Sequence, residues 1–221
     1  MVGILAQVDD IFSWASRGTD SMFVDFVSRK SDVKRKIISR VDKINNDRGK
    51  GEGVVEHQTD GGTEFINKWL DQELARRNVE PRNSQPHVKY ENGFIEAHMK
   101  EVKLAGRAMM FRGSAPDQLW PFSIQHAVRL HDLLPDPITG LTPYERRTGL
   151  EPRSADRPKN LAKGGKLFCK CYAKLYVRNN LERDAIPCIW LGKDTRSPSD
   201  LVIPIIVGHG SIEASFTWHK Y

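Results

Sequence analysis

The residues best suited to chemistry in this sequence are two carboxylates, Asp60 and Glu96, with thirty-five residues between them. Asp60 closes a short run that holds Val54-Val55 and is followed by Gly61-Gly62, as expected of a strand that leaves its sheet in a tight turn. Glu96 lies within a stretch of helical periodicity. A carboxylate at a strand end and another on a helix can converge on one spot, and divalent cations such as Mg²⁺ prefer such oxygen ligands. The pair therefore indicates a candidate metal site.

The stretch around Glu96 predicts one amphipathic helix. Its apolar positions recur at helical spacing: Ile95, Met99, Val102 and Met109. A second face holds one acid and three bases within about 40° of one line: Glu96, Lys100, Lys103 and Arg107. Such a face is either solvated, with i,i+4 pairing that stabilises the helix by about 0.2–0.5 kcal/mol, or it meets an anionic partner. The presence of a second candidate carboxylate, Asp60, favours the second interpretation, an anionic partner.

Five short motifs follow one another along the chain in an order that a known family shares. They are HQTDGGTEF (57–65), ENGFIEAHMKEV (91–102), LWPFSIQHAVRLHDLLP, LTPYERRTG and IPCIWLGKD. The first resembles the strand with the second catalytic aspartate of retroelement integrases, and the second resembles the segment with their catalytic glutamate. All five together, with the spacing of the two acids, resemble the integrase core of copia-type long-terminal-repeat retrotransposons over roughly residues 3–195. Gly61 and Ala97 depart from that pattern, which usually has asparagine and arginine there, so the chain resembles a truncated and diverged copy.

The resemblance implies an α/β fold of the ribonuclease-H-like class, a mixed sheet flanked by helices, followed by a small β-rich C-terminal module. It implies metal-dependent DNA 3′-end processing and strand transfer, in which clustered carboxylates hold Mg²⁺ or Mn²⁺. Asp60 and Glu96 are then the catalytic metal ligands, and Lys100, Lys103 and Arg107 contact DNA. The same resemblance implies a homo-oligomer and an intracellular, nuclear location.

The same chemistry needs a third carboxylate, and the sequence offers Asp9 and Asp10. They follow the strand-like run VGILAQV and precede Asp60 by 51 and 50 positions. The pattern, however, aligns this run with the second strand of the family's core, so that the family's first strand would be missing. We name Asp10 as the candidate third metal ligand and expect, on this alignment, DNA binding with little strand transfer.

Two other functions stay open on the sequence alone. A non-catalytic integrase fragment would bind nucleic acid without cutting it, and a nuclease of the same fold would only hydrolyse it. The net charge of +6 and the isoelectric point near 9.2 agree with an anionic partner in each case. No apolar run approaches the ~20 residues of a membrane span, so we expect no membrane partner.

Composition divides the chain into three parts: a core at residues 1–150, a linker at 151–165 and a β-rich module at 166–221. In the core, VGILAQV and SMFVDFVSRKS are predicted strands, with a turn at Ser16–Asp20 between them. A helix capped by Ser31 follows, with a predicted buried stripe: Val33, Ile37, Ile38, Val41 and Ile44. Its outer side holds basic residues that we expect to be solvated: Lys34, Arg35, Lys36 and Arg40. The segment PRNSQPHVKY (81–90) suits an active-site loop.

Two further helices are predicted in the second half of the core. One begins near Pro116, ends before Pro135 and packs through one side: Trp120, Ile124, Val128 and Leu130. The other has the features of a short capped helix: Thr142, Pro143, Glu145 and Gly149. Its Arg146 and Arg147 are expected on a solvated face, with DNA contact as the alternative.

The C-terminal module reads as short β runs in which basic and aromatic residues alternate. Lysines and an arginine of equal parity share one strand face: Lys166, Lys170, Lys174 and Arg178. That face fits either DNA-backbone contact or a plain amphipathic strand. The three cysteines are too few for a secreted disulfide framework. His126 and His131, five residues apart, do not share a helix face, so we expect no zinc.

Overall fold

The computed structural model describes the following residues: 2–8, 11–27, 29–47, 53–59, 68–83, 93–152, 166–174, 185–193, 199–205, 207–208, 211–212 and 219–220. The chain forms two compact units, which are described separately. Unit 1 comprises residues 1–103 and 127–160, and unit 2 comprises residues 104–126 and 161–221. The C-terminal strands are thus grouped with residues 104–126 of the core segment. The proposed linker lies outside the described residues from position 153 onward.

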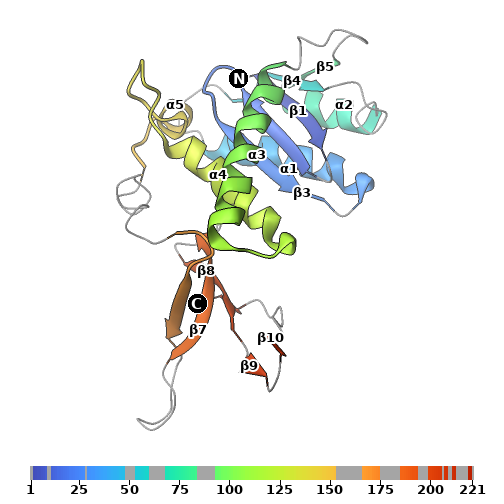
Figure 1. Ribbon diagram of the computed structural model, residues 1–221. Helices are drawn as coiled ribbons and strands as arrows, with labels where there is room; N and C mark the ends of the chain where they lie inside the picture. The colour runs from blue at the N-terminus through green and yellow to red at the C-terminus, as the bar shows by residue number, and fades with distance from the viewer. Residues whose placement is uncertain are drawn as a thin grey trace. The chain divides into compact units, whose positions relative to one another are not determined.

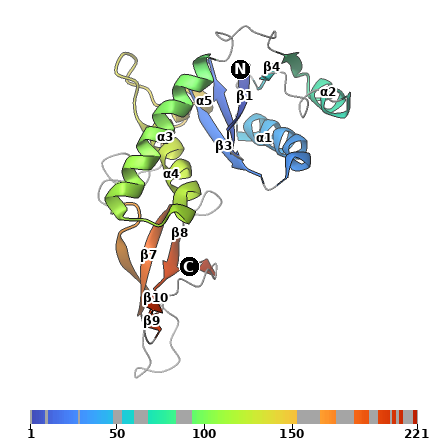
Figure 2. The same ribbon diagram turned by 45° about the vertical axis from the view of Figure 1, so that its right-hand side comes forward.

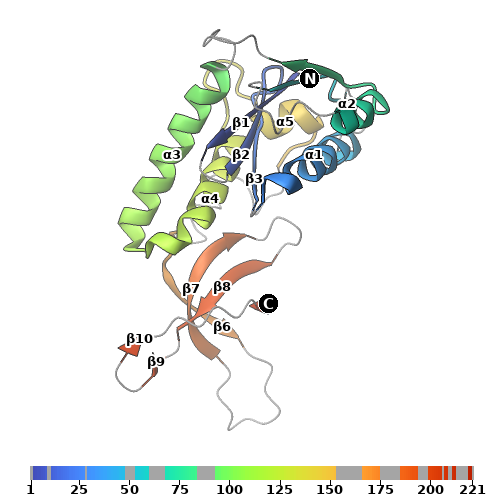
Figure 3. The same cartoon turned by 90° about the vertical axis from the view of Figure 1, so that its right-hand side faces the viewer.

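Unit 1 is built on a five-stranded mixed sheet. Its strands are β1 (Val2–Val8), β2 (Ile11–Ser16), β3 (Met22–Phe26), β4 (Glu56–Thr59) and β5 (Glu80–Asn83). They lie in the order β3-β2-β1-β4-β5. The first three are antiparallel neighbours, whereas β4 runs parallel to β1 and β5 parallel to β4. Helices α1 and α2 lie on one face of the sheet and α3 on the other (Figures 1, 2 and 3). The arrangement is that of the ribonuclease-H-like class.

The position of β1 corrects the strand alignment made from the sequence. β1 is the central strand, hydrogen-bonded to β2 on one side and to β4 on the other, and not a neighbour of the central strand. The error arose because β2 was missed. Its sequence, IFSWAS, alternates weakly since Ser13, Trp14, Ala15 and Ser16 are all buried, so no polar face marks it as a strand. The predicted turn after Ser16 is confirmed.

The helices on the α1 face form as the apolar periodicity predicts. α1 (Val33–Asp47) follows a 3₁₀ turn, Lys30–Asp32, in which Ser31 lies. All five residues of its predicted stripe are buried: Val33, Ile37, Ile38, Val41 and Ile44. They join one apolar core with Trp14 of β2 and with Leu70 and Leu74 of α2 (Lys68–Ala75), a helix that was not predicted. Burial of this stripe rather than helix propensity stabilises α1.

One of the basic residues expected on the solvated side of α1 is instead engaged. Arg40 donates two hydrogen bonds to the Asp25 carboxylate of β3, at 3.0 and 2.7 Å, and its guanidinium lies 5.0 Å from the Phe23 ring. Both partners are mostly covered from solvent. A bidentate arginine–carboxylate pair of this kind has a fixed geometry, so it ties α1 to the outer strand of the sheet.

Helix α5 (Pro143–Thr148) has the capping that its sequence predicts. The Thr142 hydroxyl accepts the backbone N–H of Glu145 at 3.0 Å, and the Glu145 carboxylate accepts the backbone N–H of Thr142 at 2.7 Å. Pro143 begins the helix, and Gly149 ends it at φ 69°. These reciprocal bonds satisfy donors that an isolated helix start leaves unpaired.

Unit 2 packs the ends of two helices against an antiparallel sheet. Its strands are β6 (Lys170–Lys174), β7 (Ala185–Lys193), β8 (Asp200–Pro204) and β11 (His219–Lys220), in the order β11-β8-β7-β6, with β9 (Val207–Gly208) and β10 (Ser211–Ile212) as a separate pair. The helical parts belong to α3 (Gly93–Gly113), the 3₁₀ turn Asp117–Leu119 and α4 (Trp120–Leu133). Leu119, Phe168 and Trp190 are buried members of one apolar cluster. Trp120, predicted to pack, is 37% exposed, because Leu119 takes the buried position.

The face of β6 agrees in part with the predicted alternation. Lys170, Tyr172 and Lys174 are exposed and share one face, while Cys171 and Ala173 alternate with them and are half-buried. Phe168 is buried in a turn before the strand, so the aromatic part of the pattern does not extend back to it. Arg178 lies outside the described residues. Across the described part of the chain, no helix has the length and apolar character needed to span a bilayer.

Candidate functional site

Glu96 lies in the first turn of α3, on the side of the helix that faces solvent. Its side chain is exposed, whereas its neighbours Ile95, Met99 and Val102 are buried, as the sequence predicted. A carboxylate in the first turn is stabilised by the unpaired N–H groups and the positive end of the helix dipole. The helix therefore fixes Glu96 on an ordered element and leaves its oxygens open to a ligand.

The strand that precedes Asp60 is β4, and it is polar and buried. The apolar run Val54-Val55 comes before the strand and is not part of it; the strand itself reads Glu-His-Gln-Thr. His57, Gln58 and Thr59 are all buried. A strand of a sheet with helices on both faces is buried on both of its sides, and because these buried residues of β4 are polar, hydrophobic periodicity does not identify the strand.

His57 is the best defined of these buried polar residues. It is 1% exposed, and its ring centroid lies 5.0 Å from that of Trp14. Burial lowers the pKa of His57 to about 4, so the ring is neutral at physiological pH. Its Nε2 atom is buried and has no hydrogen-bond partner among the described residues. His57 therefore stabilises the strand by packing and is not a candidate ligand of the proposed metal site.

The carboxyl ends of β1 and β4 lie at one edge of the sheet because the two strands are parallel. In the sequence, Asp9 and Asp10 follow β1 directly and Asp60 follows β4 directly. All three acids lie outside the described residues, so the predicted approach of Asp60 to Glu96 stays a prediction. Residues 84–90 of the expected active-site loop also lie outside, while residues 81–83 belong to β5.

The basic face of α3 is available for a partner. Lys100 and Arg107 are exposed, and Lys103 is half-buried. Among the described residues, Glu96 and Lys100 form no ion pair, although they stand four apart on one helix. The i,i+4 ion pair between these two described residues is therefore absent, while the exposure of these side chains agrees both with a solvated face and with a face that meets an anionic partner. We call the set Glu96, Lys100, Lys103 and Arg107 the outward face of α3.

The two arginines of α5 do not offer a comparable face. Arg147 is 7% exposed and donates to the Asp132 carboxylate at 3.2 Å and to the Ser21 hydroxyl at 3.3 Å. Its neighbour Arg146 pairs with Asp136 at 2.9 Å. Both the solvated and the DNA-contacting interpretations of Arg147 are wrong, because the β2–β3 turn and α4 cover it.

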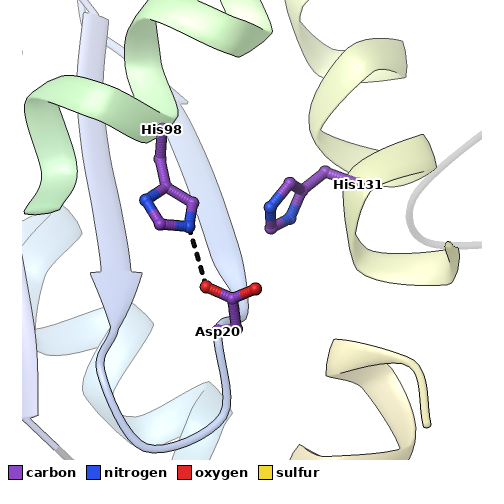
Figure 4. Close-up of side chains that lie close together, drawn as sticks. All are labelled: Asp20, His98 and His131. Carbon is purple, nitrogen blue, oxygen red and sulfur yellow. Dashed lines mark hydrogen bonds and ion pairs between the residues drawn. The ribbon is translucent and has the colours of Figure 1, made fainter. Parts of the chain in front are cut away.

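A second cluster of ligand-type side chains was not foreseen. His131 of α4, which the sequence did not indicate as a zinc ligand, lies beside His98 of α3 and Asp20 of the β2–β3 turn (Figure 4). One ligand atom from each residue lies within 4.8 Å of the others. The three are far apart in the sequence, so no local spacing signals them; only the packing of α3, α4 and the turn brings them together.

The cysteines are poor candidates for a metal site. Cys169, Cys171 and Cys188 are free thiols, and Cys171 and Cys188 are partners across β6 and β7. Burial, together with the neighbouring thiols, raises the pKa of Cys171 to about 11. A thiol must lose its proton to bind a metal, so this environment disfavours ligation.

Comparison with known sequences finds relatives among retroelement polyproteins. The chain is 26% identical over 186 residues to the retrovirus-related Pol polyprotein from transposon RE2 of Arabidopsis thaliana, which is 83% of this chain and 11% of that polyprotein. It is 27% identical over 137 residues to the corresponding polyprotein from transposon RE1, which is 61% of this chain and 9% of the relative. The chain thus spans about a tenth of the length of the curated relatives it matches. No family model matches the sequence.

Comparison with solved structures finds integrases. The catalytic core domain of BIV integrase aligns with a TM-score of 0.50 at 12% identity, over 66% of this chain and 92% of that one. A chain of the simian T-cell lymphotropic virus intasome, solved with the PP2A regulatory subunit B56 gamma, aligns with a TM-score of 0.53 at 12% identity, over 99% of this chain and 74% of that one. The HTLV-2 integrase catalytic core domain, solved with magnesium in a trimeric form, aligns with a TM-score of 0.49 at 12% identity, over 66% of this chain and 95% of that one. At this identity the first two confirm the ribonuclease-H-like fold.

Proposed function

The chain is a homologue of the Pol polyproteins of copia-type retrotransposons, and from this premise we propose that it is an integrase-like core that binds DNA but transfers strands poorly. The outward face of α3 is the DNA-contacting surface in this proposal. Asp60 and Glu96 are the remaining acids of the metal site. The proposal includes self-association and a nuclear location, where target DNA is found.

The observation that carries this proposal is the register between the two central strands. β1 pairs in parallel with β4 as far as Thr59. The β1 residue level with Thr59 is Leu5, and the residues that follow it in β1, Ala6 to Val8, carry no carboxylate. β1 itself therefore supplies no acid beside the end of β4.

Mg²⁺ or Mn²⁺ is implied by the family, and the acids present fit it incompletely. β1 contains no acidic residue between Val2 and Val8. Asp60 and Glu96 would supply two carboxylates in all, whereas Mg²⁺ releases its waters reluctantly and needs a well-formed set of oxygen ligands. DNA binding does not depend on that set, because lysines and arginines on α3 neutralise phosphates directly. The chain therefore retains the surface for DNA more completely than the site for its chemistry.

The test is a strand-transfer assay on the purified chain, with a model retroelement end and a target duplex in Mn²⁺ and in Mg²⁺. We expect DNA binding with little joining. The variant Ala6→Asp places a carboxylate on β1 one residue beyond Leu5, the partner of Thr59, and is expected to increase joining. Its matched control is Gln7→Asp, which adds the same charge one position on, at the opposite strand parity, and is expected to have no such effect.

A second candidate function, active strand transfer, is favoured by one observation. The first acid of such a site belongs to the central strand of the sheet. β1 is that strand, and Asp9 and Asp10 follow it directly in the sequence. Efficient joining by the wild-type chain, abolished by Asp9→Asn or Asp10→Asn, would establish this function and replace the first. Cleavage of the DNA end without joining would instead identify a hydrolytic nuclease.

A further inference from the structure

Three side chains of unit 1 converge from elements that are distant in sequence. Asp20 ends the turn between β2 and β3, His98 lies in α3, and His131 lies in α4 (Figure 4). Their ligand atoms lie within 4.8 Å of one another. Two imidazoles and one carboxylate that face one point from three separate elements form a donor set, and none of the three belongs to the proposed DNA-processing site.

The environment of His98 leaves one ring nitrogen directed at this point. Its Nδ1 atom lies 2.8 Å from the backbone carbonyl oxygen of Phe94, and its Nε2 atom lies 2.7 Å from the Asp20 carboxylate. Both neighbours are hydrogen-bond acceptors. Each ring nitrogen therefore contacts its oxygen favourably only through a proton or through a metal ion between them. A metal ion bound to Nε2 satisfies this arrangement, because Nδ1–H then donates to the Phe94 carbonyl. Metal-bound histidines usually make such a bond from the second nitrogen.

The environment of His131 also favours a ligand. Its ring lies 5.3 Å from that of His98 in an edge-on arrangement. Its Nδ1 atom is buried and has no hydrogen-bond partner among the described residues. The adjacent carboxylate, Asp132, is committed to Arg147 at 3.2 Å.

The backbone holds Asp20 in place. The residue adopts φ 60°, in the left-handed region that residues other than glycine seldom enter, although Asp tolerates it better than most. Its N–H donates to the Ser16 carbonyl at 2.7 Å, and the Ser16 N–H donates to the Ser21 carbonyl at 3.0 Å. The Ser16 hydroxyl accepts from Thr19 inside the turn. The carboxylate is thus presented to the helices by a rigid loop rather than by a flexible one.

From this geometry we propose that Asp20, His98 and His131 bind one divalent transition-metal ion of the zinc class, as a structural site that ties the β2–β3 turn to α3 and α4. Zinc sites use histidine nitrogen and carboxylate oxygen at about 2.0–2.2 Å, so neighbouring ligand atoms on a tetrahedral ion lie about 3.3–3.6 Å apart. The separation of 2.7 Å between His98 Nε2 and the Asp20 carboxylate and the limit of 4.8 Å for all three ligand atoms lie on either side of this spacing. Two histidines and one carboxylate leave a fourth position for water.

The site has a consequence for α3. His98 is two residues from Glu96 in the same helix. An ion bound at His98 holds the first turns of α3 against the turn of the sheet, and so fixes the helix that presents Glu96. The sequence predicted no zinc, because the cysteines are few, His126 and His131 do not share a helix face, and neither pattern includes His98 or Asp20.

The experiment measures zinc directly on the full chain. Protein freed of metal by a chelator is titrated with Zn²⁺ in competition with a chromogenic zinc indicator, and thermal unfolding is followed with and without one equivalent. We expect one tight zinc per chain and a higher unfolding temperature with zinc. Co²⁺ in place of zinc is expected to give the visible bands of a four-coordinate nitrogen–oxygen site without thiolate charge-transfer absorption. Imidazole nitrogen NMR is expected to show His98 protonated at Nδ1 in the zinc-bound protein.

Matched variants locate the ion. Asp20→Asn, His98→Gln and His131→Gln are each expected to weaken zinc binding by more than about 100-fold, since loss of a ligand exceeds the effect of an outer partner. His126→Gln is the control on the same helix, because the His126 ring packs against Trp190 at 5.7 Å and is no ligand. Glu96→Gln is the control for the DNA-processing acids. Both controls are expected to keep full zinc affinity.

Three results would overturn the proposal. One is a wild-type chain that binds no zinc in competition with the indicator, which would make the cluster a hydrogen-bonded contact between the turn and the helices. Another is a thiolate band with Co²⁺, which would place the ion at the cysteines. The third is loss of zinc in Glu96→Gln but not in Asp20→Asn. The first two need no variant, so they decide the matter even where a ligand substitution unfolds the chain.

Discussion

Two groups of cationic side chains on helices of this protein have opposite environments. Arg147 of α5 lies buried between the Asp132 carboxylate and the Phe23 and Tyr144 rings, with its guanidinium 5.0 and 5.4 Å from the two ring centres. On the outward face of α3, Lys100 and Arg107 are exposed. The contrast teaches that a basic residue on a helix is evidence for DNA binding only after its burial and its partners are known.

The physical basis of the contrast is desolvation. A buried arginine loses its hydration and must recover it from fixed partners, so its position is part of the fold. An exposed lysine keeps its hydration and its mobile counterion atmosphere, and exchanges both when it meets a phosphate. The first group should therefore affect unfolding and the second should affect DNA binding. Four substitutions, taken from the largest expected effect to the smallest, sharpen or break this division.

The largest effect is expected from Arg147→Ala. The change leaves the Asp132 carboxylate buried without its partner, so the free energy of unfolding should fall by about 3–5 kcal/mol. The matched control is the adjacent Arg146→Ala, which removes a pair with Asp136 nearer the surface and should cost less than about 1 kcal/mol. Urea denaturation of the two variants measures the difference. Equal losses would mean that Arg147 is no more structural than its neighbour.

The next effect concerns acid and the buried histidine of β4. Burial lowers the pKa of His57 from its ordinary value of 6.5 to about 4, so the unfolded chain binds the proton more readily between these values. Stability contributed by the neutral ring is present above pH 6.5 and is lost as the pH falls toward 4, by about 3 kcal/mol.

The variant His57→Gln isolates this contribution. Burial raises the pKa of Asp132, which acts in the opposite direction in acid, but wild type and variant share that group. As the pH falls from 7 to 4, wild type should therefore lose more unfolding free energy than His57→Gln does. Parallel stability profiles of the two proteins across this range would exclude the buried neutral ring.

A smaller effect is expected at the start of α5. Thr142→Ala removes the hydroxyl that accepts the Glu145 N–H, and should lower the free energy of unfolding by about 1 kcal/mol. Thr142→Ser keeps the acceptor and should recover most of the loss. A Ser variant as unstable as the Ala variant would assign the effect to packing of the threonine methyl group instead of the cap.

The smallest effect on stability, and the clearest on function, is expected on α3. Changing Lys100 and Lys103 together to Ala should alter the free energy of unfolding by less than about 0.5 kcal/mol. The same change should weaken DNA binding for all sequences alike and reduce the slope of log affinity against log salt by about 2, as phosphate contacts are lost.

The control for this last change is Arg35→Ala with Lys36→Ala, two exposed basic residues on α1. This pair removes the same charge from a helix on the other face of the sheet, and should leave the salt slope nearly intact (Figure 3). An equal change in slope for both double variants would show that net charge, and not the outward face of α3, determines DNA binding.

What the sequence determined by itself was local. The buried stripe of α1 follows from apolar residues at 3.6-residue spacing, and the boundaries of α5 follow from Thr142, Glu145 and Gly149, because caps and periodicity act within a few residues. The exposed place of Glu96 on α3 was predicted on the same basis. The family motifs led to the fold class, which the solved integrase structures confirm.

What only the tertiary structure decided was which distant elements meet. The central place of β1 depends on pairing with β2 and β4, and both strands are buried with too little alternation to be recognised along the chain. The burial of Arg147 depends on Asp132 and Ser21, and the meeting of His98, His131 and Asp20 depends on how α3, α4 and the β2–β3 turn pack. The spacing of residues along the chain predicts which side chains share a face of one helix or strand. Contacts between elements are set by how their buried surfaces fit together, and no local pattern records that.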